Sequence, residues 1–247
     1  MNILGVIPAR FASTRFPGKP LAKIQGKPMV QCVYERCVEA GCFYKIVVAT
    51  DNQEIYDVVK SFGGEVIMTD ATHTSGTDRC FEALDLIGGA DALINIQGDE
   101  PFIQPSSIAE VARLLKENAE VATLAVKAIK SAQITDVNKV KVVLGQNSDA
   151  LYFSRSVIPY QRNSPQKDWV KNADYFIHLG IYGFNNAIVG NLQSLEPSKL
   201  ELLESLEQLR WLENGYKIRV GIVKEAPMGV DTPNDLEQLN KMLETGI

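Results

Sequence analysis

The sequence predicts an α/β protein built on a three-layer, doubly wound and mostly parallel sheet. In the first half of the chain, short apolar runs alternate with amphipathic segments of about 10–13 residues, the pattern of βαβ units. The apolar runs are continuous, as in strands buried on both faces. Right-handed crossovers between parallel strands then place helices on both faces of the sheet.

The elements expected in the first half follow from their end signals. Pro28 opens a helix that stops before Gly41. Asp51 followed by Glu54 has the capping-box pattern, as does Ser107 followed by Glu110. The expected strands are residues 3–7, 45–49, 65–68 and 92–96, and the expected helices are residues 28–40, 51–62, 78–87 and 107–117.

The second half is less regular, and a polar stretch with two prolines, residues 155–174, is expected to form a long loop. Residues 198–213 are predicted to form one amphipathic helix, with leucines at every third position. Thr232 and Pro233 fit the N-cap and first turn of a last helix, with Asp235 in its acidic first turn. The expected strands are residues 121–128, 141–144, 150–153, 175–184 and 217–223.

Length and composition indicate one soluble domain over residues 1–247, with a mixed-strand subregion at about 121–185. The net charge of −5 argues against nucleic acid as the main partner. No apolar stretch is long enough for a membrane span, and no basic segment precedes the first apolar run, so we expect neither membrane insertion nor a signal peptide. The four cysteines lack a C-x-x-C pair, which favours reduced thiols and a cytoplasmic location.

A loop with three cations, Arg10, Arg15 and Lys19, follows the first expected strand. Open parallel sheets bind ligands at this end of their strands. Three cations in a short loop repel one another unless an anion joins them, and a triphosphate is such an anion. The loop lacks both the Walker A pattern and the dinucleotide fingerprint. Taken alone, it is equally compatible with a solvated basic turn.

Two aspartates are candidate ligands for Mg²⁺. Asp99, in "QGDEP", follows the strand expected at residues 92–96, at the same sheet edge as the basic loop. Asp231, in "GVDTP", precedes the last expected helix. Carboxylate oxygens suit Mg²⁺. Taken alone, however, Asp99 fits a simple turn and Asp231 a helix start that favours negative charge.

The segment "IPARFASTRFPGKPL" resembles the nucleotide-binding loop of cytidylyltransferases that activate acidic sugars. The further motifs "HTSGTDR", "QGDEP", "HLGIY", "SLEQLR" and "GVDTP" occur in the order of the 3-deoxy-manno-octulosonate (Kdo) cytidylyltransferase family. The resemblance implies a nucleotide-diphospho-sugar transferase-like fold. It also implies transfer of CMP from CTP to the anomeric hydroxyl of Kdo, with release of pyrophosphate. The product would serve lipopolysaccharide synthesis.

The same resemblance implies roles for particular residues. Asp99 and Asp231 would bind Mg²⁺, and they would be catalytic together with Lys19 and Arg10. A homodimer is implied as well, with a contact in the subregion at 121–185. The implied nucleotide-binding residues are Pro8, Ala9, Arg10, Arg15, Lys19, Ser75, Gly76, Arg79 and Gln97, and the implied sugar-binding residues are Gln97, Arg155, His178, Tyr182, Glu207 and Gln208.

Alternatives stay open at the level of sequence. Residues 160–163 and Asn185-Asn186 depart from the family pattern, so an 8-amino analogue of Kdo or a sialic acid could be the acceptor. His178, a single histidine in an expected strand, also fits a core position. A catalytically silent nucleotide-binding subunit is an alternative of another class, although the chain keeps both candidate carboxylates. An NAD-dependent dehydrogenase is disfavoured because G-x-G-x-x-G is absent.

Overall fold

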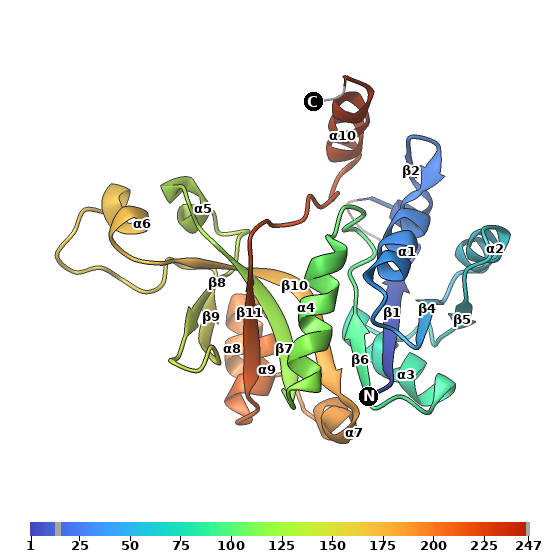
Figure 1. The fold of residues 1–247 in the computed structure, drawn as a ribbon, viewed down its shortest axis with the longest axis horizontal. Helices are drawn as coiled ribbons and strands as arrows, with labels where there is room; N and C mark the ends of the chain where they lie inside the picture. The colour runs from blue at the N-terminus through green and yellow to red at the C-terminus, as the bar shows by residue number, and fades with distance from the viewer. Residues whose placement is uncertain (13–15, 246–247) are drawn as a thin grey trace. The chain divides into compact units, whose positions relative to one another are not determined.

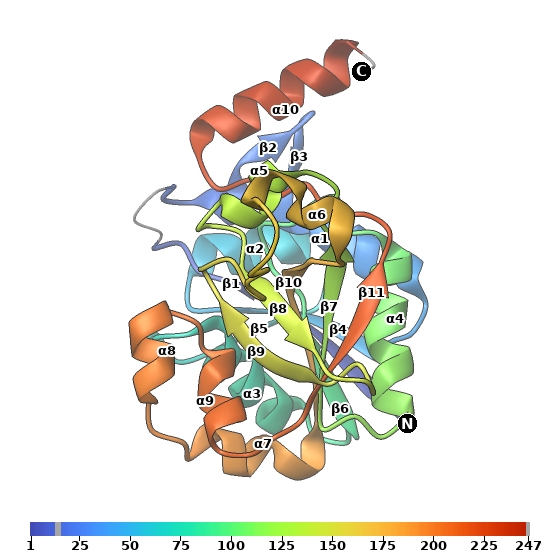
Figure 2. The same ribbon diagram turned by 90° about the vertical axis from the view of Figure 1, so that its left-hand side faces the viewer.

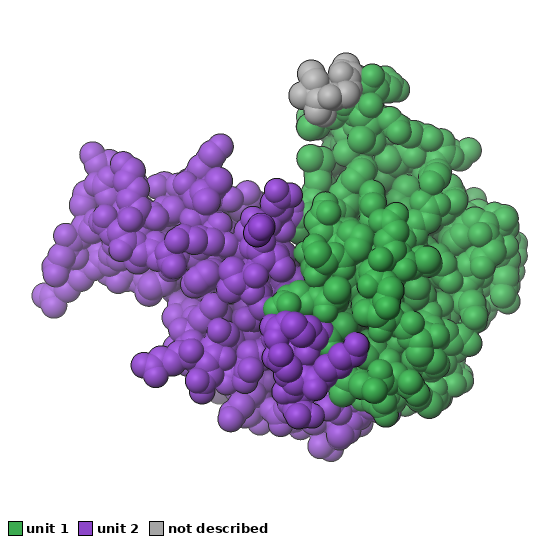
Figure 3. Space-filling view, in the orientation of Figure 1, with its two compact units in different colours: residues 1–112, 227–247 green, residues 113–226 purple. Residues whose placement is uncertain are grey.

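The computed structural model describes residues 1–12 and 16–245. The chain divides into two compact units, a first unit of Met1–Ala112 with Pro227–Ile247 and a second unit of Arg113–Ala226 (Figures 1 and 3). The subregion predicted at residues 121–185 lies within the second unit, which continues to residue 226. The expected α/β fold with a mostly parallel sheet is confirmed.

The first unit contains parallel strands in the order β6-β1-β4-β5. Along the chain, β4 and β5 are added on one side of β1, and β6 is then added on the other side. The connecting helices therefore cover both faces of the sheet. Figure 2 shows α1 and α2 on one face and α3 on the other. The elements of this part are β1 (Ile3–Ala9), η1 (Lys19–Leu21), β2 (Lys23–Ile24), β3 (Lys27–Pro28), α1 (Met29–Ala40), β4 (Lys45–Thr50), α2 (Gln53–Ser61), β5 (Val66–Met68), α3 (Gly76–Ile87), β6 (Ala92–Asn95) and α10 (Pro233–Thr245). Helix α4 (Pro105–Lys116) begins in the first unit, and its residues from Arg113 on belong to the second.

Two predicted helix starts in the first unit are wrong. Asn52, not Asp51, caps α2, because its side chain accepts a hydrogen bond from the Ile55 amide at 3.0 Å. The Asp51 carboxylate instead pairs with a buried arginine, described below. Helix α4 begins at Pro105, and Ser107 lies buried inside its first turn, where its amide donates to the Gln104 carbonyl.

The start of the last helix is as predicted. The Thr232 hydroxyl accepts from the Asp235 amide at 3.2 Å, and the Asp235 carboxylate accepts from the Thr232 amide at 2.8 Å. These hydrogen bonds lower the pKa of Asp235. Helix α10 packs on the first unit through an apolar cluster that includes Val230 and Leu239. The segment that carries Asp231 is therefore anchored on both sides.

The second unit is built on the strand order β11-β7-β10-β8-β9, in which β11 and β7 are parallel and the other pairs are antiparallel. Strand β10 carries a bulge, because its register against β7 shifts between Leu179 and Tyr182. Its elements are β7 (Val121–Lys127), α5 (Ser131–Thr135), β8 (Lys141–Leu144), β9 (Ala150–Ser154), η2 (Gln166–Asp168), α6 (Trp169–Asn172), β10 (Phe176–Asn185), α7 (Asn186–Gln193), α8 (Lys199–Glu204), α9 (Gln208–Glu213) and β11 (Ile218–Val223).

The prediction of one helix over residues 198–213 is wrong. Ser205 adopts a left-handed conformation with φ of 52°, which ends α8 and separates it from α9. Leu206 and Leu209 are buried, whereas Leu203 is 81% exposed, so the leucines do not form one buried stripe. The loop expected at residues 155–174 contains the short helices η2 and α6. No described helix combines the length and apolar composition that a membrane span needs.

Candidate active site

Two loops of the first unit, one with Gly98 and one with Gly76, approach Pro8 near the end of β1. A Cβ atom placed on Gly98 would lie 3.0 Å from the Pro8 carbonyl oxygen, and one placed on Gly76 would lie 3.5 Å from the Pro8 ring. Both loops follow strands of the same parallel sheet. Because parallel strands end at a common edge, the loops after β1, β5 and β6 form one ligand-facing surface. Ala9, the last residue of β1, is buried beneath it.

Lys19 connects the two aspartates expected to bind a metal. Its Nζ atom lies 2.7 Å from Asp99 Oδ2 and 3.5 Å from Asp231 Oδ1, and it also donates to the Val230 carbonyl at 3.1 Å. The Val230 amide donates in turn to the Asp99 carbonyl at 3.0 Å. The structure therefore brings together a cation and two carboxylates from distant parts of the chain. The lysine side chain is 13% exposed, whereas those of Asp99 and Asp231 are 37% and 58% exposed.

Glu100 is a feature of the site that sequence reasoning missed. Its Oε2 atom is buried and has no hydrogen-bond partner among the described residues. Burial, together with the charges of Asp99 and Asp231, raises the pKa of Glu100 to about 7. Its position directly after Asp99 was the only available signal. Three carboxyl groups create a negative potential here that a single lysine does not fully neutralise.

This donor set fits a magnesium ion. Mg²⁺ commonly takes one or two carboxylates and completes its shell with water and substrate phosphates. Asp99 and Asp231 already flank a cation, the Lys19 ammonium, which shows that the position between them favours positive charge. No group of three or more His, Cys, Asp or Glu side chains suited to a metal occurs in the described ranges.

The basic loop is closed at its base, where the Gly18 amide donates to the Phe11 carbonyl at 2.9 Å. Gly18 has a φ of 69°, a conformation that favours glycine. Arg10 is exposed and donates from Nη1 to the Thr74 carbonyl at 3.1 Å, so it joins this loop to the segment before α3. Arg15, the remaining predicted cation, lies outside the described residues.

The segment before α3 and the helix are joined by side chains from both. Ser75 caps α3 by accepting from the Asp78 amide at 3.0 Å. Glu82 Oε2 accepts from the Asp70 amide at 2.9 Å and contacts His73 Nε2 at 2.6 Å. The backbone amides at the start of α3, including that of Gly76, are well placed to meet a polar ligand.

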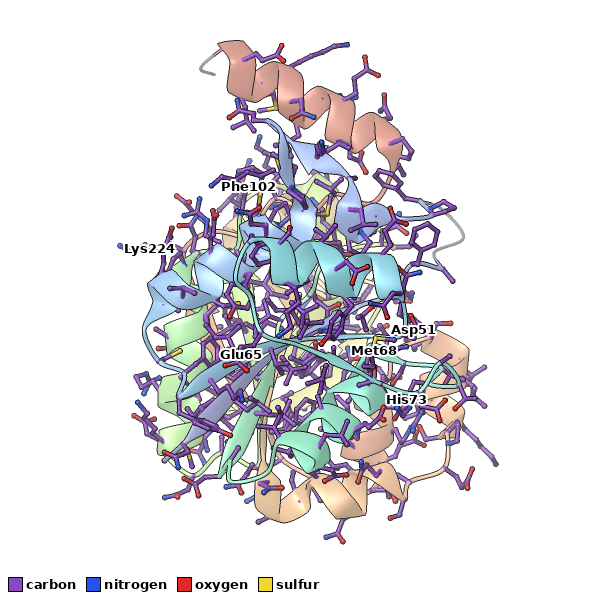
Figure 4. The ribbon with its side chains drawn as sticks, turned by 90° about the vertical axis from the view of Figure 1, so that its right-hand side faces the viewer. Asp51, Glu65, Met68, His73, Phe102 and Lys224 are labelled. Carbon is purple, nitrogen blue, oxygen red and sulfur yellow. The ribbon has the colours of Figure 1, made fainter. Side chains whose placement is uncertain are left out.

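Arg79 is completely buried, although the resemblance implied that it binds nucleotide. Its Nη2 atom donates to Asp51 Oδ2 at 2.8 Å, and its Nη1 atom donates to the Thr69 hydroxyl. These contacts tie α3 to the carboxyl ends of β4 and β5, where Figure 4 labels Asp51 and Met68. In this geometry Arg79 supports the ligand-facing loop from behind, and direct contact with the nucleotide stays a prediction.

Gln97 lies in the first unit, half-buried shortly after β6, and its carbonyl accepts from the Glu100 amide at 3.2 Å. The other residues predicted to bind the sugar belong to the second unit. Arg155 donates from Nε to the Glu204 carbonyl at 2.7 Å, and more weakly to the carbonyls of Val137 and Ser205. Three of its five N–H groups are thereby used, and one on each terminal nitrogen has no acceptor among the described residues.

A buried lysine supports the same region of the second unit. Lys141 Nζ donates to the carbonyls of Asp136 at 2.9 Å and Lys139 at 2.6 Å, and to that of Arg155. The Glu204 carboxylate accepts from the Ser154 hydroxyl at 2.6 Å and from the Arg155 amide at 2.9 Å. These contacts tie the end of β9 to the break after α8, which directly precedes Glu207 and Gln208.

His178 and Tyr182 belong to one aromatic cluster in the second unit. Their ring centroids are 5.3 Å apart, and Phe153 packs edge-on against His178 at 5.0 Å. Burial lowers the pKa of His178 to about 3, so the ring is neutral. The Tyr182 hydroxyl is buried without a partner among the described residues, and burial and the nearby Glu207 charge raise its pKa. Gln208 is also buried.

Comparison with known proteins shows the family to which the chain belongs. The family described as Cytidylyltransferase matches residues 4–218. The 3-deoxy-manno-octulosonate cytidylyltransferase of Bacteroides thetaiotaomicron is 50% identical over 250 residues, covering 99% of both chains. That of Haemophilus influenzae is 45% identical, covering 98% of this chain and 99% of the relative. A solved structure of CMP:2-keto-3-deoxy-manno-octonic acid synthetase complexed with CTP matches with a TM-score of 0.93 and 41% identity, over the full length of both chains. The chain therefore belongs to the cytidylyltransferase family, with 3-deoxy-manno-octulosonate cytidylyltransferases as its relatives.

Proposed function

We propose that this protein transfers CMP from CTP to the anomeric hydroxyl of Kdo and releases pyrophosphate. The observation that carries the proposal is the Asp99–Lys19–Asp231 cluster at the ligand-facing edge of the first unit. Two carboxylates that can hold a metal and a cation that can meet the phosphates match the needs of phosphoryl transfer, in which negative charge on the phosphates and the leaving group must be neutralised. Family membership indicates that the nucleotide is CTP and that the acceptor is Kdo.

Lys19 and Arg10 are proposed to hold the β- and γ-phosphates, together with Arg15. Lys19 spans the aspartates in the structure, and in the presence of CTP its ammonium would turn to the phosphate oxygens. Asp99 and Asp231 would then hold Mg²⁺. When bound, Mg²⁺ would lower the pKa of the sugar hydroxyl and neutralise charge on the phosphates. The chain's own contribution is to place the attacking oxygen in line with the α-phosphorus.

The rest of the nucleotide is assigned to the loops around Pro8 and Ala9. Ser75 and Gly76 offer backbone groups to the base and ribose from the start of α3. Arg79 would maintain this loop through Asp51 and Thr69.

The acceptor sugar is assigned to Gln97 and to five residues of the second unit. The two remaining N–H groups of Arg155 suit the sugar carboxylate. A neutral His178 and the unpartnered Tyr182 hydroxyl suit sugar hydroxyl groups. Glu207 and Gln208, placed by the break after α8, would bind further hydroxyls.

We also propose a homodimer in the cytoplasm, with CMP-Kdo supplied to lipopolysaccharide synthesis. The homodimer rests on family resemblance, and the cytoplasmic location on the reduced cysteines expected from the sequence. Sedimentation equilibrium over a range of protein concentrations tests the oligomeric state.

Pyrophosphate release from CTP and Mg²⁺ tests the reaction. Parallel assays should contain Kdo, its 8-amino analogue or N-acetylneuraminate, each with the wild-type protein and Asp99→Asn. Release with Kdo that is lost in the variant supports the proposal. Release only with another sugar would replace Kdo as the acceptor, and no release with any sugar would favour a silent nucleotide-binding subunit.

A further inference from the structure

Strand β7 lies beside β10 (Figure 1), and Thr123 of β7 lies where the register of β10 shifts, between Leu179 and Tyr182. Thr123 is completely buried. Its Oγ1 atom lies 2.7 Å from the Ile181 carbonyl oxygen, 3.2 Å from the Leu179 carbonyl oxygen and 3.0 Å from His178 Nε2. The bulge directs these groups toward one hydroxyl, which has a single proton to donate.

The hydroxyl proton must point to a carbonyl. Two oxygen atoms approach to 2.7 Å only when a hydrogen atom lies between them, and a carbonyl oxygen has none to offer. The Thr123 hydroxyl therefore donates its proton to the carbonyl of Ile181, which is the nearer of the two. The remaining contact, between Oγ1 and His178 Nε2, can be a hydrogen bond only if Nε2 donates.

We propose that Thr123 is a positioning residue that fixes His178 in the tautomer with its proton on Nε2. The other ring nitrogen, Nδ1, then carries a lone pair and acts only as an acceptor. Within the described part of the chain, Nδ1 has no hydrogen-bond partner. The rings of Phe153 and Tyr182 pack against the imidazole and restrict its rotation.

The consequence concerns recognition of the acceptor sugar, and this part rests on the proposed function. A neutral imidazole acceptor binds a hydroxyl group through its proton and offers nothing to a carboxylate. Burial keeps the ring uncharged over the working pH range. His178 therefore selects a hydroxyl of the sugar, and the carboxylate is left to a cation such as Arg155.

Two substitutions separate the effect of the Thr123 hydroxyl from the effect of the shape of its side chain. Thr123→Val keeps the branched side chain and removes the hydroxyl, whereas Thr123→Ser keeps the hydroxyl. In Thr123→Val we expect the KM for Kdo to rise about tenfold, the effect of one hydrogen bond, while the KM for CTP changes less than about twofold. Thr123→Ser should restore most of the affinity for Kdo.

The tautomer can be measured directly by ¹⁵N NMR of the imidazole nitrogens. The chain contains only two histidines, so the spectrum of His73→Gln assigns the signals of His178. We expect a protonated Nε2 and an unprotonated Nδ1 in the wild-type protein, and a mixture of tautomers in Thr123→Val. The wild-type spectrum decides the tautomer even if Thr123→Val does not fold.

A proton on Nδ1 in the wild-type protein overturns the proposal. An unchanged KM for Kdo in folded Thr123→Val, or an equal rise in the KM values for Kdo and CTP, also overturns it. Absence of turnover by the wild-type protein with Kdo would instead contradict the proposed function, while the NMR spectrum would still decide the tautomer.

Discussion

The candidate residues of the two units use opposite chemistry. In the first unit, the ammonium of Lys19 lies between the partly exposed carboxylates of Asp99 and Asp231. In the second unit, the groups around His178 are an uncharged imidazole, a buried phenol and aromatic rings. The residues of the first unit are suited to binding charged groups. Those of the second unit are suited to recognising the shape of a ligand and the direction of its hydrogen bonds.

This difference follows from what each part would bind. A triphosphate and a metal ion carry multiple charges that change during the reaction, so their site needs ionic groups that are already in place to neutralise them. A sugar is distinguished by the directions of its hydroxyl groups, which call for fixed donors and acceptors. Burial of neutral groups fixes direction at a lower desolvation cost than burial of charges.

The largest effect is expected from removing the ammonium group of Lys19 in the first unit. Lys19→Gln should lower kcat about 10²–10³-fold, because one preorganised charge at the phosphates is lost. The measurement is steady-state pyrophosphate release. Lys23→Gln is the matched control, since Lys23 is exposed and its described contacts, with Pro28 across the β2–β3 pair and with Asn240, are made by the backbone. Equal activity of the two variants would contradict the charge-based account of the first unit.

An acid-dependent loss of stability should come from the second unit. The pKa of His178 is about 3 in the folded protein, against an ordinary value of 6.5. Below pH 6.5 the unfolded chain therefore binds more protons, and the contribution of neutral His178 to stability is lost as pH falls from 6.5 toward 3. Between pH 7 and pH 5 this amounts to about 2 kcal/mol.

Urea unfolding of wild type and His178→Gln at these two pH values measures that contribution. The fall in the free energy of unfolding should be smaller in the variant by about the same 2 kcal/mol. An identical fall in both proteins would show that the second unit is not organised around an uncharged imidazole.

A third test concerns the close backbone approach in the first unit. Gly98→Ala would place a methyl group 3.0 Å from the Pro8 carbonyl oxygen. We expect a loss of about 1–2 kcal/mol in stability and a rise of about tenfold in the KM for CTP, because the loops around Pro8 must separate.

Gly190→Ala is the control for this substitution. Gly190 lies in α7, and a Cβ atom there meets nothing within 4 Å. That change should stabilise the protein by about 0.5–1 kcal/mol. Calorimetric melting of both variants separates the close approach at Gly98 from the general effect of replacing glycine.

The smallest effect is expected at the break between α8 and α9. Ser205→Gly should raise the free energy of unfolding by about 0.5–1 kcal/mol, because glycine adopts a positive φ without the steric cost of a side chain. Activity with Kdo should change little, since Arg155 contacts the backbone carbonyl of Ser205. A loss of stability would indicate that the serine side chain itself supports the break.

The parallel strands of the first unit could be predicted well because their signals are local. Continuous apolar runs, glycine stops and Thr232 as a cap each act over a few residues, and the strands and the last helix formed as expected. The carboxyl ends of parallel strands share one edge, so Arg10, Lys19 and Asp99 were placed on the same side of the sheet. Asp231 was paired with Asp99 only through resemblance.

Other features depended on partners far away in the sequence. Asp51 has a residue type suited to a helix cap, but the buried guanidinium of Arg79 binds its carboxylate and Asn52 takes the cap. Residues 198–213 have helical periodicity, but the chain turns at Ser205, whose carbonyl accepts from Arg155. Neither competing contact leaves a trace in the local pattern.

The sequence by itself determined the fold class, the edge of the sheet that faces a ligand and the set of motifs that marks the family. These depend on periodicity and on residue types within short windows. Only the tertiary structure determined which charged and polar groups lie next to each other. It placed Lys19 between two aspartates, buried Arg79 and the Oε2 atom of Glu100, and brought the Thr123 hydroxyl to His178. Hydrogen-bond direction and burial are properties of distances between atoms, and those distances exist only once the chain has folded.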